Sequence, residues 1–259
     1  MKIAIIGAGN MGGAIARGLA HGNMDVNIAV ADLAQDKLDE LKAEYNAIEV
    51  STDSAAIVAD ADVVLLAVKP WLVEPVLKSV LPTLDLSRQI ILSIAAGVDI
   101  ATLTSWLGDE TAVVFRAIPN TAISIHQSMT FVCHNANAKV EQVTQVETIF
   151  NALGKAAVIE ERLMGAATSL CSCGIAFAMR YVRAATEGGV ELGIYPNDAK
   201  QYVLQTLRGA VELLEATDNN PEVEIDKVTT PGGITIKGLN AMEAHGFTTA
   251  VIEGLKASK

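Results

Sequence analysis

The feature that most constrains this sequence is a glycine-rich motif close to its start, between an apolar run and a helical segment. The motif has the pattern G-x-G-x-x-G and comprises Gly7, Gly9, Asn10, Met11 and Gly12. It follows a predicted strand over Lys2–Ile6 and opens a predicted helix from about Met11 to His21. In this context the three glycines permit a tight turn, a close approach of backbone to a pyrophosphate, and close packing of helix on strand. The segment therefore predicts a dinucleotide-binding site in which amides at a helix start hold phosphate.

An acidic residue stands where such a site needs one. The second predicted strand, Val26–Ala31, ends at Asp32, 20 residues after Gly12. A carboxylate there binds the 2′-hydroxyl of the adenosine ribose and repels a 2′-phosphate. Asp32 therefore favours NADH over NADPH. The alternative interpretation is that Asp32 has no role in cofactor binding and only caps the next helix.

The wider pattern predicts two domains. Further buried strands are expected at Val63–Val68, Ile90–Ile94 and Ala112–Phe115, and helical stretches alternate with the strands. This alternation is typical of an α/β fold with a doubly wound parallel sheet. After about residue 160 the strands disappear, and long helices are expected at Met164–Gly193, at Asp198–Ala216 and from about Thr235 onward. We therefore expect a Rossmann-like dinucleotide-binding domain over residues 1–160 and an all-helical domain over residues 161–259.

Composition excludes several kinds of partner. Acidic residues outnumber basic ones by 30 to 19, giving a net charge of -11, which argues against nucleic acid and against an anionic membrane surface. The three cysteines form no disulfide framework and have no zinc-ligand spacing, so we expect a cytoplasmic protein without a metal. The uncharged stretch Leu163–Met179 resembles a membrane span in length, but its small polar residues favour a helix buried in a core or a subunit interface.

A second candidate anion site lies near the C-terminus. Pro231 ends the preceding element, Gly232 and Gly233 permit positive φ, and Thr235 falls in the first turn of the next helix. Such a turn exposes amides suited to a small carboxylate. An ordinary turn between helices is the alternative.

These motifs, together with others in the same order, resemble the pyrroline-5-carboxylate reductases along nearly the whole chain. The matching blocks are Ile6–Gly12, Ala67-Val68-Lys69-Pro70, Ser93-Ile94-Ala95-Ala96-Gly97, Arg116-Ala117-Ile118-Pro119-Asn120-Thr121, Thr230–Gly238 and Glu243-Ala244-His245-Gly246-Phe247. The resemblance implies hydride transfer from NAD(P)H to the imine carbon of 1-pyrroline-5-carboxylate, which gives L-proline. It also implies a C-terminal domain that interlocks two subunits, in dimers that often build larger rings.

The resemblance also assigns roles to individual positions. Cofactor contacts are implied for the glycine motif, Asp32, Ser54, Ala67, Lys69, Ala95 and Ala96. Substrate contacts are implied for Asn120, Gly232, Gly233, Ile234 and Thr235. Thr235 would hydrogen-bond or orient the ring nitrogen, and Asp218 stands where relatives carry an acid near that nitrogen. Because an iminium is already a strong electrophile, positioning and charge balance should dominate catalysis.

The sequence departs from the family pattern in three places, which leaves substrate choice open. Ala122 replaces the usual proline after Asn-Thr, and Ile234 takes a position often held by threonine. The common Ser-Gly-Ser-Gly-Pro-Ala-Tyr is replaced by Cys171-Ser172-Cys173-Gly174-Ile175-Ala176-Phe177, without the proline and the tyrosine hydroxyl. Two alternatives therefore stand beside the proline-forming reductase. One is a reductase of another cyclic imine, or a β-hydroxy acid dehydrogenase, with the same two-domain plan. The other is a non-catalytic nucleotide-binding regulator.

Overall fold

The computed structural model describes residues 1–22 and 24–259, and it divides into two compact units. Unit 1 comprises Met1–Ser172 and unit 2 comprises Cys173–Lys259. The α/β and all-helical halves predicted from the sequence are confirmed. The compact unit extends past the predicted boundary at residues 160/161 because the segment after β8 packs with the sheet.

Unit 1 is built on one eight-stranded sheet in the order β3-β2-β1-β4-β5-β6-β7-β8. Its strands are β1 (Lys2–Ile6), β2 (Asn27–Ala31), β3 (Glu49–Ser51), β4 (Val63–Leu66), β5 (Ile90–Ser93), β6 (Val113–Ile118), β7 (Ser128–His134) and β8 (Gly154–Val158). Neighbouring strands are parallel except for the β6–β7 pair. The chain leaves β1 for β2 on one side and later returns to β4 on the other. The carboxyl ends of β1 and β4 therefore form the switch point at which such sheets bind ligands.

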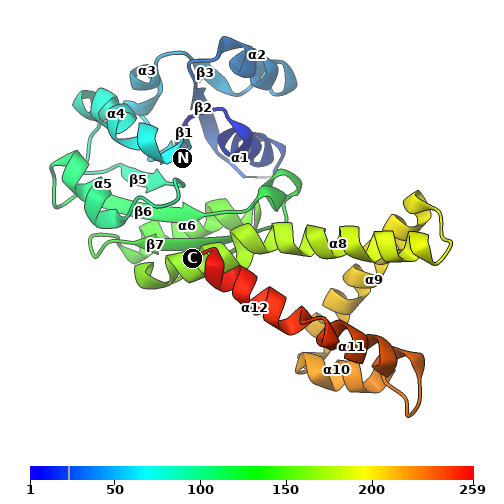
Figure 1. Cartoon of the computed structure of the whole chain (residues 1–259). Coiled ribbons are helices and arrows are strands. Elements are labelled where there is room, and N and C mark those ends of the chain that lie inside the picture. The colour runs from blue at the N-terminus through cyan, green and yellow to red at the C-terminus, as the bar shows by residue number, and fades with distance from the viewer. Residues whose placement is uncertain (23) are drawn as a thin grey trace. The chain divides into compact units, whose positions relative to one another are not determined.

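Helices cover both faces of this sheet (Figure 1). The helical elements of unit 1 are α1 (Asn10–His21), α2 (Gln35–Glu44), α3 (Ser54–Val58), α4 (Pro70–Val80), η1 (Leu81–Thr83), α5 (Ile100–Leu107), η2 (Thr121–Ile125), α6 (Val140–Asn151), η3 (Glu161–Leu163) and α7 (Met164–Ala167). A π-helical turn, η4 (Thr168–Cys173), follows α7.

The two faces of the sheet carry separate apolar cores, because successive side chains of a strand point to opposite sides. On β1, Ile3 and Ile5 belong to the cluster that includes side chains of α1, α2 and α6. Ala4 and Ile6 belong to the other cluster, with α3, α4 and α5. A sheet buried on both faces needs continuous apolar strands, which explains why the central strands appear as such runs in the sequence.

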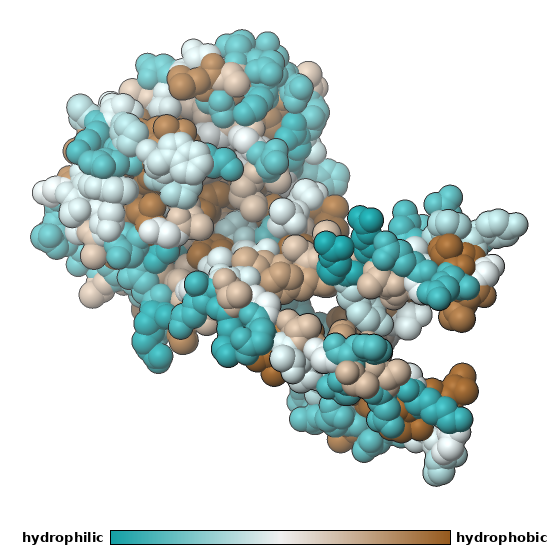
Figure 2. Space-filling model, in the orientation of Figure 1, coloured by the Kyte–Doolittle hydropathy of each residue, from teal (hydrophilic) through white to brown (hydrophobic). Residues whose placement is uncertain are grey.

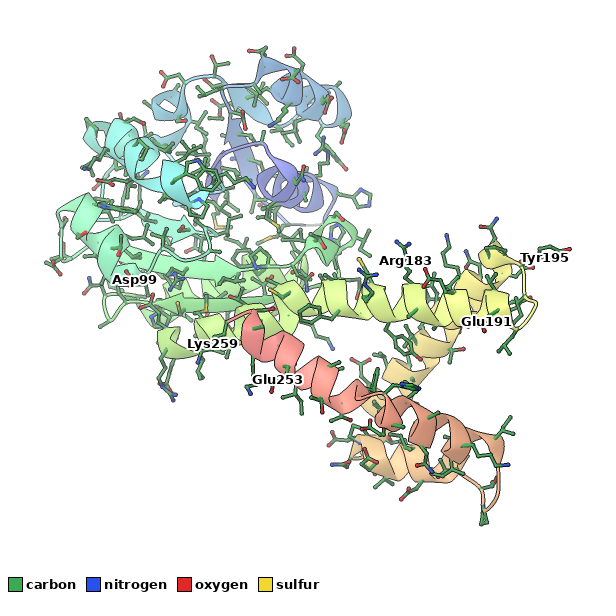
Figure 3. The ribbon with its side chains drawn as sticks, in the orientation of Figure 1. Asp99, Arg183, Glu191, Tyr195, Glu253 and Lys259 are labelled. Atoms are coloured by element: carbon green, nitrogen blue, oxygen red, sulfur yellow. The ribbon has the colours of Figure 1, made fainter. Side chains whose placement is uncertain are left out.

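Unit 2 contains only helices, and few of its side chains are buried. The helices are α8 (Gly174–Glu191), α9 (Pro196–Thr217), α10 (Pro221–Val228), α11 (Ile234–Ala244) and α12 (Phe247–Ala257). Ala199 is the single buried residue of Cys173–Lys259. Large apolar side chains are exposed instead, and Figure 2 shows hydrophobic residues (brown) on the surface near the turn between α8 and α9. In this turn Leu192 is 85% exposed and Tyr195 is 80% exposed. Tyr195 projects from this turn in Figure 3.

The stretch Glu161–Glu191 is long and apolar enough to cross a membrane by length and composition alone, and 17% of its most apolar window is buried. Its sequence predicted one long helix from Met164 to Gly193. The structure confirms a continuous helical stretch over 164–191, in which α7, the π-helical turn η4 and α8 follow one another without a break. The stretch expected to be helical from Thr235 onward is divided at Gly246, where φ is 77°.

Candidate functional site

The glycine motif forms a tight loop between β1 and α1, and its first and third glycines are required by the fold. Gly7 has φ of 109°, and a Cβ there would lie 2.6 Å from the carbonyl oxygen of Ala67. A Cβ on Gly12 would collide with the carbonyl oxygen of Gly7 and lie 2.8 Å from the Cβ of Ala67. These contacts bring β1, β4 and α1 together at the switch point.

Gly9 has a different environment. A Cβ on Gly9 would meet nothing within 4 Å, and its backbone is extended with φ of -67°. No contact among the described residues therefore explains a glycine here. A backbone left bare at the start of α1, beside the unpaired amides of the first turn, suits a pyrophosphate that approaches from outside the chain.

Asp32 is held against this loop. Its Oδ2 accepts a hydrogen bond of 2.6 Å from the amide of Ala8, and its Oδ1 accepts one of 2.9 Å from the amide of Ala34. The carboxylate thus lies at the carboxyl end of β2 and faces the loop after β1. It does not cap α2 by a side-chain bond, because the N-cap of that helix is Ala34.

The remaining predicted cofactor residues lie at strand ends along the same edge. Ala67 follows β4 and donates its amide to the carbonyl of Ile6, while Lys69 is the exposed N-cap of α4. Ala95 and Ala96 follow β5, where the Ala95 amide donates to the Ser93 hydroxyl at 3.2 Å. Ser54 is the first residue of α3. The structure therefore brings the predicted cofactor residues to one edge of the sheet, and their contacts with a cofactor stay predictions.

A cleft of about 430 Å³ connects α1 with the segment after β6. Its lining residues are Asn10, Met11, Ala14, Arg17, Thr121, Ile123 and Ser124. A cleft of about 510 Å³ lies elsewhere, among residues of α1, β2 and the segment around Tyr45. The larger cleft includes Val26 and Asn27 at the amino end of β2. It therefore lies away from the carboxyl ends of the parallel strands, where the predicted cofactor residues are.

Asn120 is held by hydrogen bonds within unit 1. Its amide nitrogen donates to the Ser128 hydroxyl at 3.1 Å, and its Oδ1 accepts from the Ala122 amide at 3.0 Å. Its Nδ2 donates to the carbonyl of Cys171 at 3.5 Å. The side chain, 9% exposed, thus organises the segment after β6. A contact between Asn120 and the substrate stays a prediction.

In unit 2 the second anion motif forms the turn that starts α11. Gly232 has φ of 73°, and a Cβ on Gly233 would lie 2.5 Å from the hydroxyl of Thr230. The Gly233 amide donates to the Thr230 carbonyl at 2.9 Å, so it already has a partner within the turn, and its contact with a substrate carboxylate stays a prediction. The first-turn amides of Ile234 and Thr235 have no partner within the helix, and both residues are exposed.

The second predicted catalytic residue, Asp218, ends α9. It adopts the left-handed conformation with φ of 51°, and its side chain is exposed. Asp and Asn occupy this conformation more readily than other side chains, so the turn itself accounts for part of the choice. The roles of Asp218 and Thr235 in catalysis stay predictions.

Sequence reasoning missed a partly buried ion pair between β6 and η3. Arg116, on β6, is 7% exposed, and its guanidinium donates to the Glu161 carboxylate at 2.6 Å. Glu161 also accepts from the Ile100 amide at 2.8 Å, so it joins η3 to β6 and to α5. On the neighbouring strand, burial raises the pKa of the Cys133 thiol to about 11, which makes it a poor nucleophile. A charged residue directly after the apolar run Ala112–Phe115 was the signal available in the sequence.

The doubly wound sheet, the open glycine loop and the acidic residue after β2 define a dinucleotide-dependent oxidoreductase. Residues 2–97 match the family model described as NADP oxidoreductase, coenzyme F420-dependent, and residues 161–259 match pyrroline-5-carboxylate reductase dimerisation. The chain is 35% identical to pyrroline-5-carboxylate reductase of Methanosarcina acetivorans, over 100% of this chain and 97% of that one. It belongs to the pyrroline-5-carboxylate reductase family and is an NAD(P)H-dependent oxidoreductase.

Other relatives agree with this placement. Pyrroline-5-carboxylate reductase 1 of Dictyostelium discoideum is 37% identical over 99% of this chain, which spans 48% of that relative's length. The crystal structure of Plasmodium falciparum pyrroline carboxylate reductase with NADP bound has a TM-score of 0.90 and 27% identity, covering 100% of this chain and 95% of that one.

Proposed function

We propose that this chain reduces 1-pyrroline-5-carboxylate to L-proline, the final step of proline biosynthesis, with NADH as the favoured reductant. The observation that carries the proposal is the family match over the full chain, together with two glycine turns that expose amides for anions. The first turn suits a pyrophosphate, and the second suits the carboxylate of a small ring substrate. A non-catalytic regulator would have no use for the second turn.

The residues of the chain have simple tasks in this reaction. A bound reduced nicotinamide would supply a hydride to the carbon of the protonated imine, whose nitrogen would keep its proton and end as an amine. The amides of Gly232 and Ile234 hold the substrate carboxylate, and the Thr235 hydroxyl orients the ring nitrogen. Asp218 balances the positive charge of the protonated imine. Because the imine is already electrophilic, holding the reacting atoms in place provides most of the rate enhancement.

The Thr235→Ala variant tests this assignment. Loss of a hydrogen bond to a charged group should lower kcat/KM for 1-pyrroline-5-carboxylate by roughly 10- to 100-fold. The measurement is the steady-state oxidation of NADH and NADPH by wild type and variant. Thr206→Ala is a matched control, because the exposed Thr206 hydroxyl donates to the Tyr202 carbonyl of its own helix at 2.8 Å.

The same assay decides among the alternatives. Turnover by wild type with 1-pyrroline-5-carboxylate supports the proposal, and turnover restricted to another cyclic imine or to a β-hydroxy acid contradicts it. Binding of dinucleotide without turnover of any of these substrates would favour a regulator. Kinetics of Thr235→Ala equal to those of wild type would remove Thr235 from the mechanism.

Asp32 carries the proposed preference for NADH. Its carboxylate is fixed by the Ala8 and Ala34 amides, so it cannot turn away from a 2′-phosphate without breaking both bonds. Asp32→Ser should lower the ratio of kcat/KM for NADH to that for NADPH by roughly tenfold or more, because one charge repulsion is lost. Asp36→Ser, which removes an exposed acid in the first turn of α2, is the control. An unchanged ratio in Asp32→Ser would contradict the proposal.

We also propose that two copies of the chain pair through unit 2, and that the enzyme is cytoplasmic. The dimerisation model covers residues 161–259, and this segment exposes large apolar side chains on its helices. Burial of those side chains against a second copy explains them without a membrane. The three free cysteines are compatible with a reducing compartment. Such dimers could in turn assemble into larger rings.

A further inference from the structure

The turn η4 is fastened to the segment that follows β6 by a hydrogen bond that the proposed function does not use. The Ser172 hydroxyl donates to the carbonyl of Pro119 at 2.8 Å. Beside it, the Cys171 carbonyl accepts from Asn120 Nδ2 at 3.5 Å. Two consecutive residues of η4 therefore hold two consecutive residues of the segment after β6.

The local helix geometry allows this attachment. η4 is a π-helical turn, and such turns occur frequently at functional sites because they widen the helix. The bond joins residues 53 positions apart in the sequence, and it is partly buried.

The segment held in this way follows a strand on the side of the sheet where the reacting half of a dinucleotide would lie. Asp32 and the phosphate loop would hold an adenosine on the β2 side of β1. A nicotinamide would then lie on the opposite side of β1, toward β4, β5 and β6. β6 is three strands from β1, which is about 14 Å at the usual strand spacing. Pro119 and Asn120 follow β6 directly.

The other polar groups of this segment already have partners. The Asn120 amide donates to Ser128, and its Oδ1 accepts from Ala122. These bonds fix the Asn120 side of the Pro119–Asn120 peptide through β7 and η2. The Ser172 bond fixes the carbonyl on the other side of the same peptide.

We propose that Ser172 is a positioning residue, whose hydroxyl holds the Pro119–Asn120 peptide in the place that sets the nicotinamide against the imine. This inference rests on the proposed function and adds a residue to it. Without the hydroxyl, the Pro119 carbonyl loses its bond and the peptide gains freedom to move. One such bond changes a local equilibrium by about fivefold, and small displacements of a reacting group lower the rate of chemistry.

Three variants of the full chain test the proposal. Ser172→Ala removes the bond, and Ser172→Thr keeps a hydroxyl. Ser169→Ala is a matched control in the same turn, because the buried Ser169 hydroxyl has no hydrogen-bond partner in the part of the chain that the structure describes. The readouts are kcat and KM with 1-pyrroline-5-carboxylate, the primary isotope effect with NADH deuterated at C4, and hydrogen exchange of residues 119–125 without cofactor.

We expect Ser172→Ala to lower kcat by about 3- to 10-fold, to leave KM for the imine within about twofold, and to raise the isotope effect. Hydrogen exchange at residues 119–125 should be faster by a similar factor. Ser172→Thr should recover most of kcat, and Ser169→Ala should match wild type in every readout.

Several results would overturn the proposal. One is a wild-type kcat in Ser172→Ala, whether or not exchange at residues 119–125 is faster. Another is an equal loss in Ser169→Ala, which would indicate general loosening of η4. If wild type fails to reduce 1-pyrroline-5-carboxylate, the proposed function itself is wrong. If hydrogen exchange at residues 119–125 is unchanged in Ser172→Ala, the Ser172–Pro119 hydrogen bond does not hold this segment, and the positioning role is rejected separately.

Discussion

At the scale of single residues, the three glycines of the phosphate loop are needed for different physical reasons, although they form one motif. Gly7 and Gly12 are small because Ala67 and the Gly7 carbonyl occupy the adjacent space. A Cβ added at Gly9 would meet no atom of the described residues within 4 Å. Substitution should therefore separate the stability of the fold from the affinity for a dinucleotide.

Gly9→Ala should leave the free energy of unfolding within about 1 kcal/mol of wild type, because no contact is strained. The added methyl group should still raise the Kd for NADH by about tenfold or more, because it occupies the path of the pyrophosphate. Gly7→Ala should instead destabilise the fold by several kcal/mol, since its φ of 109° and its contact with Ala67 both forbid a Cβ. Urea unfolding and fluorescence titration with NADH check the two effects, and equal destabilisation by both variants would contradict this distinction.

At the scale of elements, α5 of unit 1 begins with a side-chain cap, which α1, α2 and α4 do not have. Asp99, labelled in Figure 3, caps α5, and its Oδ1 accepts from the Thr102 amide at 2.8 Å. Hydrogen bonds from the Thr102 side chain and backbone hold the pKa of Asp99 below its ordinary value. A carboxylate whose pKa is lowered by folding stabilises the fold above its unfolded pKa, and that stabilisation is lost as pH falls through the folded pKa.

Asp99→Ala should therefore reduce the free energy of unfolding by about 1 kcal/mol at neutral pH. The difference from wild type should shrink as pH falls below the ordinary pKa of an aspartate, and it should vanish as pH falls through the lower pKa that Asp99 has in the folded protein. Because Asp99 is exposed, water screens its charge and the effect should stay near this size. Asp99→Asn keeps a capping oxygen but does not titrate. The difference in the free energy of unfolding between Asp99→Asn and Asp99→Ala should therefore be nearly independent of pH. A pH-independent difference between wild type and Asp99→Ala would contradict the assignment to charge.

The elements also show how far the sequence could predict the structure. β1, β2, β4, β5 and β6 were predicted within a few residues, because a strand buried on both faces must be continuously apolar. β7 was missed because Ser128 and Thr130 are buried on it and hydrogen-bond to each other, which interrupts the apolar pattern. The turn η4 has no periodicity that distinguishes it from an α-helix. Local motifs such as the glycine loop were therefore predictable, whereas the bonds from Cys171 and Ser172 to residues about 50 positions earlier were not.

At the scale of the whole molecule, the exposed apolar helices of unit 2 predict association. Wild type should elute with a mass of twice the 27.2 kDa chain, or a multiple of that, in size-exclusion chromatography with light scattering. Val211→Glu places a charge among the apolar side chains of α9, where Val211 is 56% exposed, and should shift the equilibrium toward the monomer. Val140→Glu, at a 77% exposed position of α6 in unit 1, should leave the mass unchanged. A monomeric wild type would contradict the prediction.

Because unit 2 has almost no buried side chains, the stability of the protein should depend on its own concentration. Helices that bury only Ala199 between them gain little of the apolar burial that stabilises a folded chain. The second copy then acts as a stabilising ligand, so mass action applies to unfolding itself. The urea midpoint should rise with protein concentration, and dilution alone should weaken the fold of the C-terminal helices.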